Sequence, residues 1–157
     1  MIKILHNPDC FGIMKRLVYV IIILIIYTSL SHSKEVNCPS HNVYVIDADT
    51  IKLCNMKIRL NGISAAERGH ATYKPCKKIV EKIIAETDTV SCKLTGDMTY
   101  DRHVGICRVT KKDKTEDLQQ KIIKNGCARD CRRYSKGKYK IFETEASREL
   151  PLPNYCK

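Results

Sequence analysis

Alternating apolar residues between Val43 and Leu60 constrain the fold more than any other feature of the chain. Apolar side chains recur at every second position on both sides of a short acidic turn, and again around a second turn at Asn55 and Met56. This period of two is typical of half-buried β-strands joined by tight turns. The stretch therefore predicts three consecutive strands, whose core-facing positions are Val43, Val45, Ile51, Leu53, Ile58 and Leu60.

The remaining sequence adds helices and two further strands after a polar lead-in over 34–42. Apolar residues at helical spacing, and strand-like runs between turns, predict helices over 76–85, 117–125 and 141–150 and strands over 89–94 and 104–109. This element order predicts an α+β domain. Short strands with polar turns suit a small five-stranded β-barrel of the oligonucleotide-binding type, with about three helices packed outside it.

The first 33 residues are predicted to be a secretory signal peptide. A basic pair, an apolar run and small residues follow one another as such a peptide requires, at Lys15–Arg16, Leu17–Tyr27 and Ser31–Ser33. The apolar run is shorter than the roughly 20 residues of a bilayer span, although an uncleaved N-terminal anchor is the alternative. Met14 is a candidate for the true start. Cleavage would leave 34–157 as one secreted or periplasmic domain without membrane association.

The cysteine content also points to export. Eight of the nine cysteines lie after residue 33, at Cys38, Cys54, Cys76, Cys92, Cys107, Cys127, Cys131 and Cys156. An even number in a small exported domain predicts disulfides. Zinc binding is the rival interpretation, but there is no CxxC pair, and His41, His70 and His103 lack ligand spacing to the cysteines.

The chain is strongly basic, with a formal charge of +11. The predicted signal peptide carries a net +2, so the remainder keeps +9. Such an excess favours polyanionic partners, which include nucleic acid, anionic lipid and cell-wall polymer.

Charged residues in and after the three strands suggest metal-assisted chemistry on a phosphate. Asp47 and Asp49 flank a turn, so their carboxylates can converge on a hard cation such as Ca²⁺; an ordinary hairpin turn is the alternative. Arg59 could stabilise charge in a phosphorane-like transition state, or form a surface salt bridge. Glu67 could accept a proton from an attacking water, or simply be solvated.

Four blocks of sequence, in order, resemble the thermonuclease (staphylococcal nuclease-like) family over most of 43–145. They are VIDADTIKL, IRLNGISAAE, YDRHVGICRV and a helix that ends in NGCARDCRRYSKGKY. The resemblance implies an oligonucleotide-binding barrel with helices. It also implies Ca²⁺-dependent cleavage of phosphodiester bonds in DNA and RNA.

The resemblance implies roles for individual residues. Asp49 matches the family's metal-binding aspartate, and Asp47 matches the supporting acid of the same turn. Arg59 matches the arginine that contacts the scissile phosphate, and Glu67 the carboxylate that acts on water. Ser64 occupies the position of the family's second metal aspartate, which is expected to weaken cation binding because affinity depends on ligand charge.

The third and fourth blocks supply further candidates. DRHVG departs from the family's DRYGR, so the second catalytic arginine has no direct counterpart, and Arg102 and Arg108 are the candidates to replace it. Ala48 replaces the glycine of the family's DGDT. The basic loop is expected to hold nucleic acid through Arg132, Arg133, Tyr134, Lys136 and Lys138. Because strands 89–94 and 104–109 should form a hairpin, Cys92 and Cys107 are the preferred disulfide.

Three functions remain open from the sequence. The first is an exported, monomeric, Ca²⁺-dependent nuclease that binds DNA or RNA without sequence preference. The second is a nucleic-acid-binding module on the same fold without catalysis, which Ser64 and the altered DRHVG block favour. The third is a disulfide-rich binder of protein or sugar, because fold alone does not fix function.

Overall fold

The computed structural model describes Arg16, Val18, Tyr19 and Ile21 together with residues 34–157. The chain divides into two units, Met1–His32 and Ser33–Lys157. The four described residues of the first unit are helical. The predicted signal peptide therefore lies almost wholly outside the described residues. Within the part that is described, no helix is long and apolar enough to cross a membrane.

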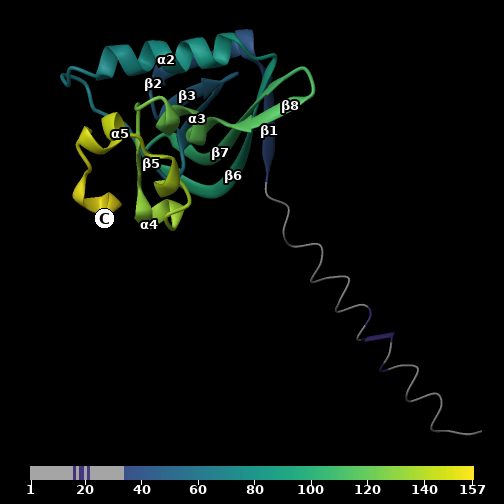
Figure 1. Cartoon of the computed structure of the whole chain (residues 1–157). Coiled ribbons are helices and arrows are strands. Elements are labelled where there is room, and N and C mark those ends of the chain that lie inside the picture. Colours follow the sequence, from purple (N-terminus) through teal and green to yellow (C-terminus); the bar gives the residue numbers. More distant parts are fainter. Residues whose placement is uncertain (1–15, 17, 20, 22–33) are drawn as a thin grey trace, which may run out of the picture. The chain divides into compact units, whose positions relative to one another are not determined.

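A seven-stranded sheet forms the centre of the second unit (Figure 1). Its strands are β1 (Glu35–Pro39), β2 (Val43–Asp47), β3 (Thr50–Leu53), β4 (Met56–Leu60), β6 (Thr89–Thr99), β7 (Arg102–Lys111) and β8 (Lys114–Asp117). The order is β1-β6-β7-β4-β3-β2, and β8 pairs with β7. Only β4 and β7 pair in parallel; the other pairs are antiparallel. A separate two-stranded sheet joins β5 (Ile63–Ser64) to β9 (Arg129–Asp130).

Four α-helices and three short 3₁₀ helices complete residues 34–157. They are α2 (Tyr73–Ala85), α3 (Leu118–Lys124), α4 (Arg132–Ser135), α5 (Glu145–Glu149), η1 (Ser40–Asn42), η2 (Lys140–Phe142) and η3 (Asn154–Cys156). Figure 1 shows α2 lying along the sheet, and the yellow C-terminal segment returning to α4. Contacts between α4 and η3, and between α2 and β2, agree with this view.

The predicted α+β class is confirmed, but the sheet is larger than five strands. The segment 34–42, predicted to be a polar lead-in, contains β1, which pairs with β6 so that Cys38 faces Val90. The core-facing side chains of β1 are Val36 and Cys38. Two alternating apolar residues in a polar segment are too short a pattern to predict a strand. Within 34–157 no pairing joins β1 to β2, so the sheet is not a closed barrel.

The single helix predicted over 141–150 is also wrong, because the chain is divided there into η2 and α5. Glu143 lies between them in extended conformation. Its side chain is buried, accepts a hydrogen bond from the Asp130 backbone N–H at 2.9 Å and pairs with Lys140 at 2.6 Å. Thr144 then caps α5 by accepting from the Ser147 N–H. A buried carboxylate and a new N-cap therefore interrupt the predicted helix.

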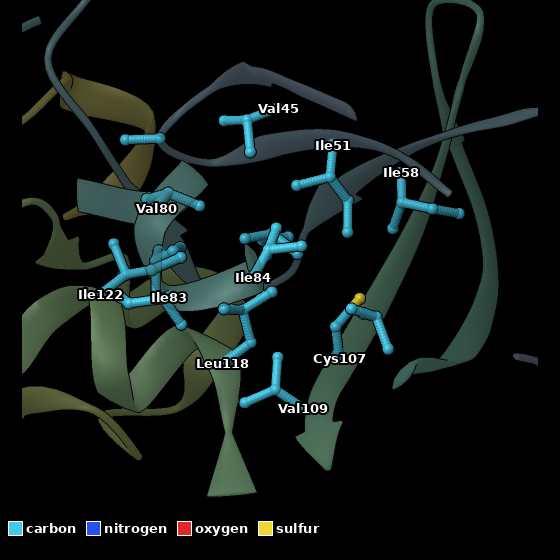
Figure 2. Close-up of a cluster of buried hydrophobic side chains, with 14 of the residues drawn as sticks. Val45, Ile51, Ile58, Val80, Ile83, Ile84, Cys107, Val109, Leu118 and Ile122 are labelled. Carbon is cyan, nitrogen blue, oxygen red and sulfur yellow. The ribbon is translucent and has the colours of Figure 1, made fainter. Parts of the chain in front are cut away.

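The hydrophobic core lies between the sheet and the helices α2 and α3 (Figure 2). Val80 and Ile84 of α2 and Ile122 of α3 point toward strand residues such as Ile51, and each is at most 3% exposed. Burying each aliphatic side chain of this size contributes about 1.5–3 kcal/mol. The period-two and helical patterns of the sequence predicted these positions, because burial of one face of a strand or of a helix produces the two patterns.

Four disulfides link every cysteine within 34–157. They are Cys38–Cys54, Cys76–Cys127, Cys92–Cys107 and Cys131–Cys156. Cys92 and Cys107 lie opposite each other on β6 and β7, as the hairpin prediction requires. Such a set of disulfides is typical of proteins that fold in an oxidising compartment.

The turn after β4 is held tightly against α4. Gly62 has φ +78°, and a Cβ atom added there would lie 2.9 Å from the Cβ of Ser135. Its carbonyl also accepts a hydrogen bond from the Cys131 N–H at 2.9 Å. A glycine is needed here for both the dihedral and the close approach. The end of β4 and the segment that begins α4 are thereby fixed side by side.

Candidate active site

The acidic turn between β2 and β3 is anchored to the end of β4. The backbone carbonyl of Asp49 accepts a hydrogen bond from the Leu60 N–H at 2.8 Å and from Arg59 Nη1 at 3.1 Å. Ala48, which replaces the glycine expected from the resemblance, does not have a positive φ. An alanine is therefore unstrained in this turn.

The carboxylate of Asp49 is buried, and each of its oxygens accepts at least one hydrogen bond. Its Oδ2 pairs with Arg59 Nη1 at 2.8 Å and accepts from the Ala65 N–H at 2.9 Å. Its Oδ1 accepts from Thr50 Oγ1 at 3.1 Å. The side chains of Asp49 and Arg59 are only 10% and 15% exposed. The turn, the strand β4 and the loop after β5 therefore meet at one carboxylate.

Burial and the proximity of Asp47 both affect the protonation of Asp49 in this turn. Burial raises the pKa of Asp49 to about 6, against the opposing effect of Arg59, and the neighbouring Asp47 adds to the rise. Asp47 Oδ1 is buried and has no hydrogen-bond partner. A buried oxygen without a hydrogen-bond partner costs free energy unless a water molecule, an ion or a ligand binds it.

The structure brings the three predicted catalytic side chains to one pocket of about 540 Å³, which Arg59, Glu67 and Arg102 all line. Arg102 donates from Nη1 to Thr50 Oγ1 at 3.4 Å, and so reaches the hydroxyl that binds Asp49. Glu67 is exposed, and within residues 34–157 its carboxylate has neither a hydrogen bond nor an ion pair. Arg108, the other candidate arginine, is exposed on β7 and does not line this pocket.

The arginine donors are only partly used. Arg59 makes its contacts through Nη1, and Arg102 uses Nη1 and Nε, the latter toward the Thr99 carbonyl at 3.4 Å. In the described part of the chain, Nη2 of both arginines and Nε of Arg59 have no hydrogen-bond partner. A bound oxyanion could therefore take up these donors.

Tyrosine side chains form much of the remaining pocket wall. Tyr134, which the sequence placed at the nucleic-acid site, lines the pocket together with Tyr100 and Tyr155. These three residues are 50%, 93% and 47% exposed, respectively. Tyr100 follows β6 and Tyr155 lies in η3. Neither residue was predicted from the sequence, although Cys156 beside Tyr155 was a candidate for a disulfide that attaches the C-terminal tail to the domain.

The predicted basic residues of the loop after α3 do not line the pocket. Arg132, Arg133, Lys136 and Lys138 are exposed, and none of them lines the pocket. Lys138 pairs with Asp117 at 2.8 Å, and Arg133 lies over the Tyr134 ring at 5.8 Å. Only Tyr134 from this predicted set contacts the pocket directly.

The donors near the turn fit a weakly held divalent cation. The unsatisfied Asp47 Oδ1 beside the Asp49 carboxyl is the kind of oxygen pair that a hard cation prefers. Ser64, buried on β5, supplies a hydroxyl where the resemblance expects a carboxylate. No group of three or more His, Cys, Asp or Glu residues suited to a metal occurs within the described residues.

Comparison with known proteins adds no family assignment. No protein-family model matches the chain, and no curated protein is significantly similar to it. The thermonuclease resemblance therefore rests on the motif residues alone.

Proposed function

We propose that this chain is an exported, metal-assisted phosphodiesterase that cleaves the backbone of nucleic acid. The observation that carries the proposal is the meeting of Arg59, Arg102 and Glu67 at one pocket beside the buried Asp47–Asp49 turn. Two guanidinium groups suit an anionic phosphate, and an unpaired carboxylate suits proton transfer. The basic charge of the chain favours the same class of substrate.

The arginines would bind the scissile phosphate and stabilise the charge that develops on it. Arg59 is pre-oriented because its Nη1 is held by both the backbone and the side chain of Asp49. Arg102 is held through Thr50 and Thr99. Donors fixed before the reaction need no reorganisation in the transition state, and removing one such donor typically costs about 10²–10³ in rate.

Glu67 would accept the proton of the attacking water. Its carboxylate lines the pocket and is not committed to any partner within 34–157. A positioned general base typically contributes about 10²–10⁴ in rate. The proton would pass to a Glu67 oxygen as the water oxygen bonds to phosphorus and the leaving oxygen departs.

Asp47 and Asp49 would hold the divalent cation, for which Ca²⁺ is our candidate. When bound, such a cation polarises a phosphoryl oxygen and offsets the charge of the reacting phosphate. The role of Arg59 here is twofold, because the same side chain neutralises Asp49 and faces the pocket. Binding is expected to be weak because Ser64 offers a neutral hydroxyl where the resemblance expects a further carboxylate.

The strand order supports an oligonucleotide-binding type of fold as part of this proposal. Strands β2, β3, β4, β7 and β6 are neighbours in that order, with one parallel pair between β4 and β7. Oligonucleotide-binding folds are five-stranded, partly open barrels that bind their ligand on one strand face and its loops. The four disulfides support export of the mature domain, which we propose to be monomeric.

A binding module without catalysis is the second candidate function. Ser64 favours it, because a neutral hydroxyl stands where the resemblance expects a second metal carboxylate. Such a module would keep the arginines and tyrosines for contact with nucleic acid but would not hydrolyse it.

The two candidates are separated by cleavage of a fluorogenic oligonucleotide by the purified, oxidised protein. We expect cleavage with Ca²⁺, none with EDTA, and a large loss in the Glu67→Gln variant. Glu149→Gln, which changes an exposed glutamate outside the pocket, is the matched control. Binding without cleavage in any divalent cation would reject the phosphodiesterase and favour the module.

A further inference from the structure

Tyr155 is brought to the pocket by the C-terminal disulfide. It belongs to η3, and the next residue of η3, Cys156, is joined to Cys131 at the start of α4. Both Cys131 and Tyr155 line the pocket that contains Arg59 and Glu67. The chain returns 25 residues along the sequence to make this link. The disulfide therefore builds part of the pocket wall.

The surroundings of Tyr155 suggest what it contacts. Its ring is 47% exposed at a pocket wall that also carries Tyr134 and Tyr100. In soluble proteins exposed aromatic rings beside cationic groups are a common platform for bases of single-stranded nucleic acid, because every base has a face that can stack. A duplex would not offer such a face, since its bases are already stacked on one another.

We infer that Tyr155 stacks on a nucleobase next to the cleaved phosphate, and that the Cys131–Cys156 disulfide completes this base site. The inference rests on the proposed function and assigns the substrate contact to an unpaired, single-stranded segment. Arg59 and Arg102 contact the phosphate, whereas Tyr155 contacts the base. The base site depends on an oxidised tail, so reduction of this one disulfide would lower substrate affinity.

The test measures binding separately from cleavage. In the Glu67→Gln background with Ca²⁺, anisotropy is recorded for a labelled oligothymidylate and for an abasic strand of equal length. Tyr155→Ala is expected to weaken binding of the oligothymidylate by about tenfold, the size of one lost stacking contact, and to leave the abasic strand unaffected. Tyr155→Phe should bind as the parent does. Tyr44→Ala, which removes a 63% exposed tyrosine outside the pocket, is the matched control.

A second pair of variants tests the disulfide. Cys131→Ala/Cys156→Ala should lose affinity for the oligothymidylate as Tyr155→Ala does. Cys38→Ala/Cys54→Ala also removes one disulfide, but neither cysteine lines the pocket, so affinity should be retained. Both double variants are compared after circular dichroism has shown that they are folded, and Tyr155→Ala, which keeps all four disulfides, decides the case if either is not.

The outcomes separate this inference from the proposed function. If the protein cleaves nucleic acid but Tyr155→Ala binds the oligothymidylate normally, the base site is wrong and the phosphodiesterase stands. Equal losses for the oligothymidylate and the abasic strand would also overturn the base site. If the parent binds neither strand, the proposed function and this inference both fail.

Discussion

Two cations of β4 point to the same side of the strand, two residues apart, yet their ion pairs differ. Lys57 pairs with Asp101, and their side chains are 47% and 68% exposed. Arg59 pairs with Asp49, and theirs are 15% and 10% exposed. The pKa of Asp101 is lowered by its hydrogen bond from Lys57, whereas burial raises that of Asp49. The anionic form of Asp101 is thus stabilised by its partner, whereas burial disfavours the anionic form of Asp49.

The two pairs also lie at different pockets. Lys57 and Asp101 line a second, more open hollow with Cys54 and His103. Arg59 lines the pocket that holds Glu67 and Arg102. An exposed pair adds little to stability, and a buried pair often stabilises less than apolar residues would. A gain in folding stability alone therefore does not account for the buried pair.

The largest expected effect is on stability. Arg59→Ala leaves the buried Asp49 carboxylate without its cation, and breaking a buried pair in this way costs about 3–5 kcal/mol. Urea unfolding monitored by circular dichroism measures the loss. Asp49 would be protonated more readily in this variant, so the loss should shrink at low pH. An unchanged urea midpoint at neutral pH would show that the two pairs are energetically alike.

The second prediction compares two arginines of β7. Arg102→Ala should slow oligonucleotide cleavage by about 10²–10³, because it removes a donor to the reacting phosphate. Arg108→Ala changes an exposed arginine of the same strand outside the pocket, and should cleave at close to the normal rate. Equal rates for the two variants would remove Arg102 from the site.

The third prediction concerns the pH dependence of stability without divalent cations. The pKa of Asp49 is about 6 in the folded protein and near 3.8 when unfolded, so between these values the folded state holds a proton that the unfolded state has released. Stability from this group is therefore lost as pH rises from about 4 to 6, by about 2–3 kcal/mol. Urea unfolding of the protein and of Asp49→Asn is compared at pH 4.0 and 7.0, roughly the two ends of this window. The comparison isolates the pH-dependent contribution of Asp49 to the free energy of unfolding, and Ca²⁺ should reduce this contribution. A difference between the two proteins that does not vary with pH would contradict the raised pKa.

The smallest effect is expected at the exposed pair. Lys57→Ala should leave the urea midpoint and the cleavage rate nearly unchanged, because solvent and salt already screen both partners. A large loss of activity in this variant would place the reactive site at the second hollow.

The strands and the acidic turn could be predicted because their patterns are local. Alternation at Val45, Ile51 and Ile58 follows directly from burial of one face of the sheet. The division of the last predicted helix could not, since it depends on Glu143 bonding to Asp130, thirteen residues away. Local sequence does not record such a buried contact.

The candidate site follows the same rule. Asp49, Arg59 and Glu67 lie within some twenty residues of one another, and the thermonuclease resemblance implied that they share one site. Arg102 could be named only as one of two candidates, because its approach to Thr50 depends on the pairing of β4 with β7. Tyr155 reaches the pocket through a disulfide that eight cysteines allow but do not specify.

The central claim is that the pocket beside the buried pair performs the reaction, and reciprocal substitutions on β4 test it most directly. Cleavage of one oligonucleotide with Ca²⁺ is measured for Arg59→Lys and for Lys57→Arg, after both are shown to be folded. Lysine cannot reproduce the fixed, forked donors of arginine, so we predict that Arg59→Lys is slowed by about 100-fold. Lys57→Arg should cleave as the parent does. Equal activity of the two variants would contradict the account.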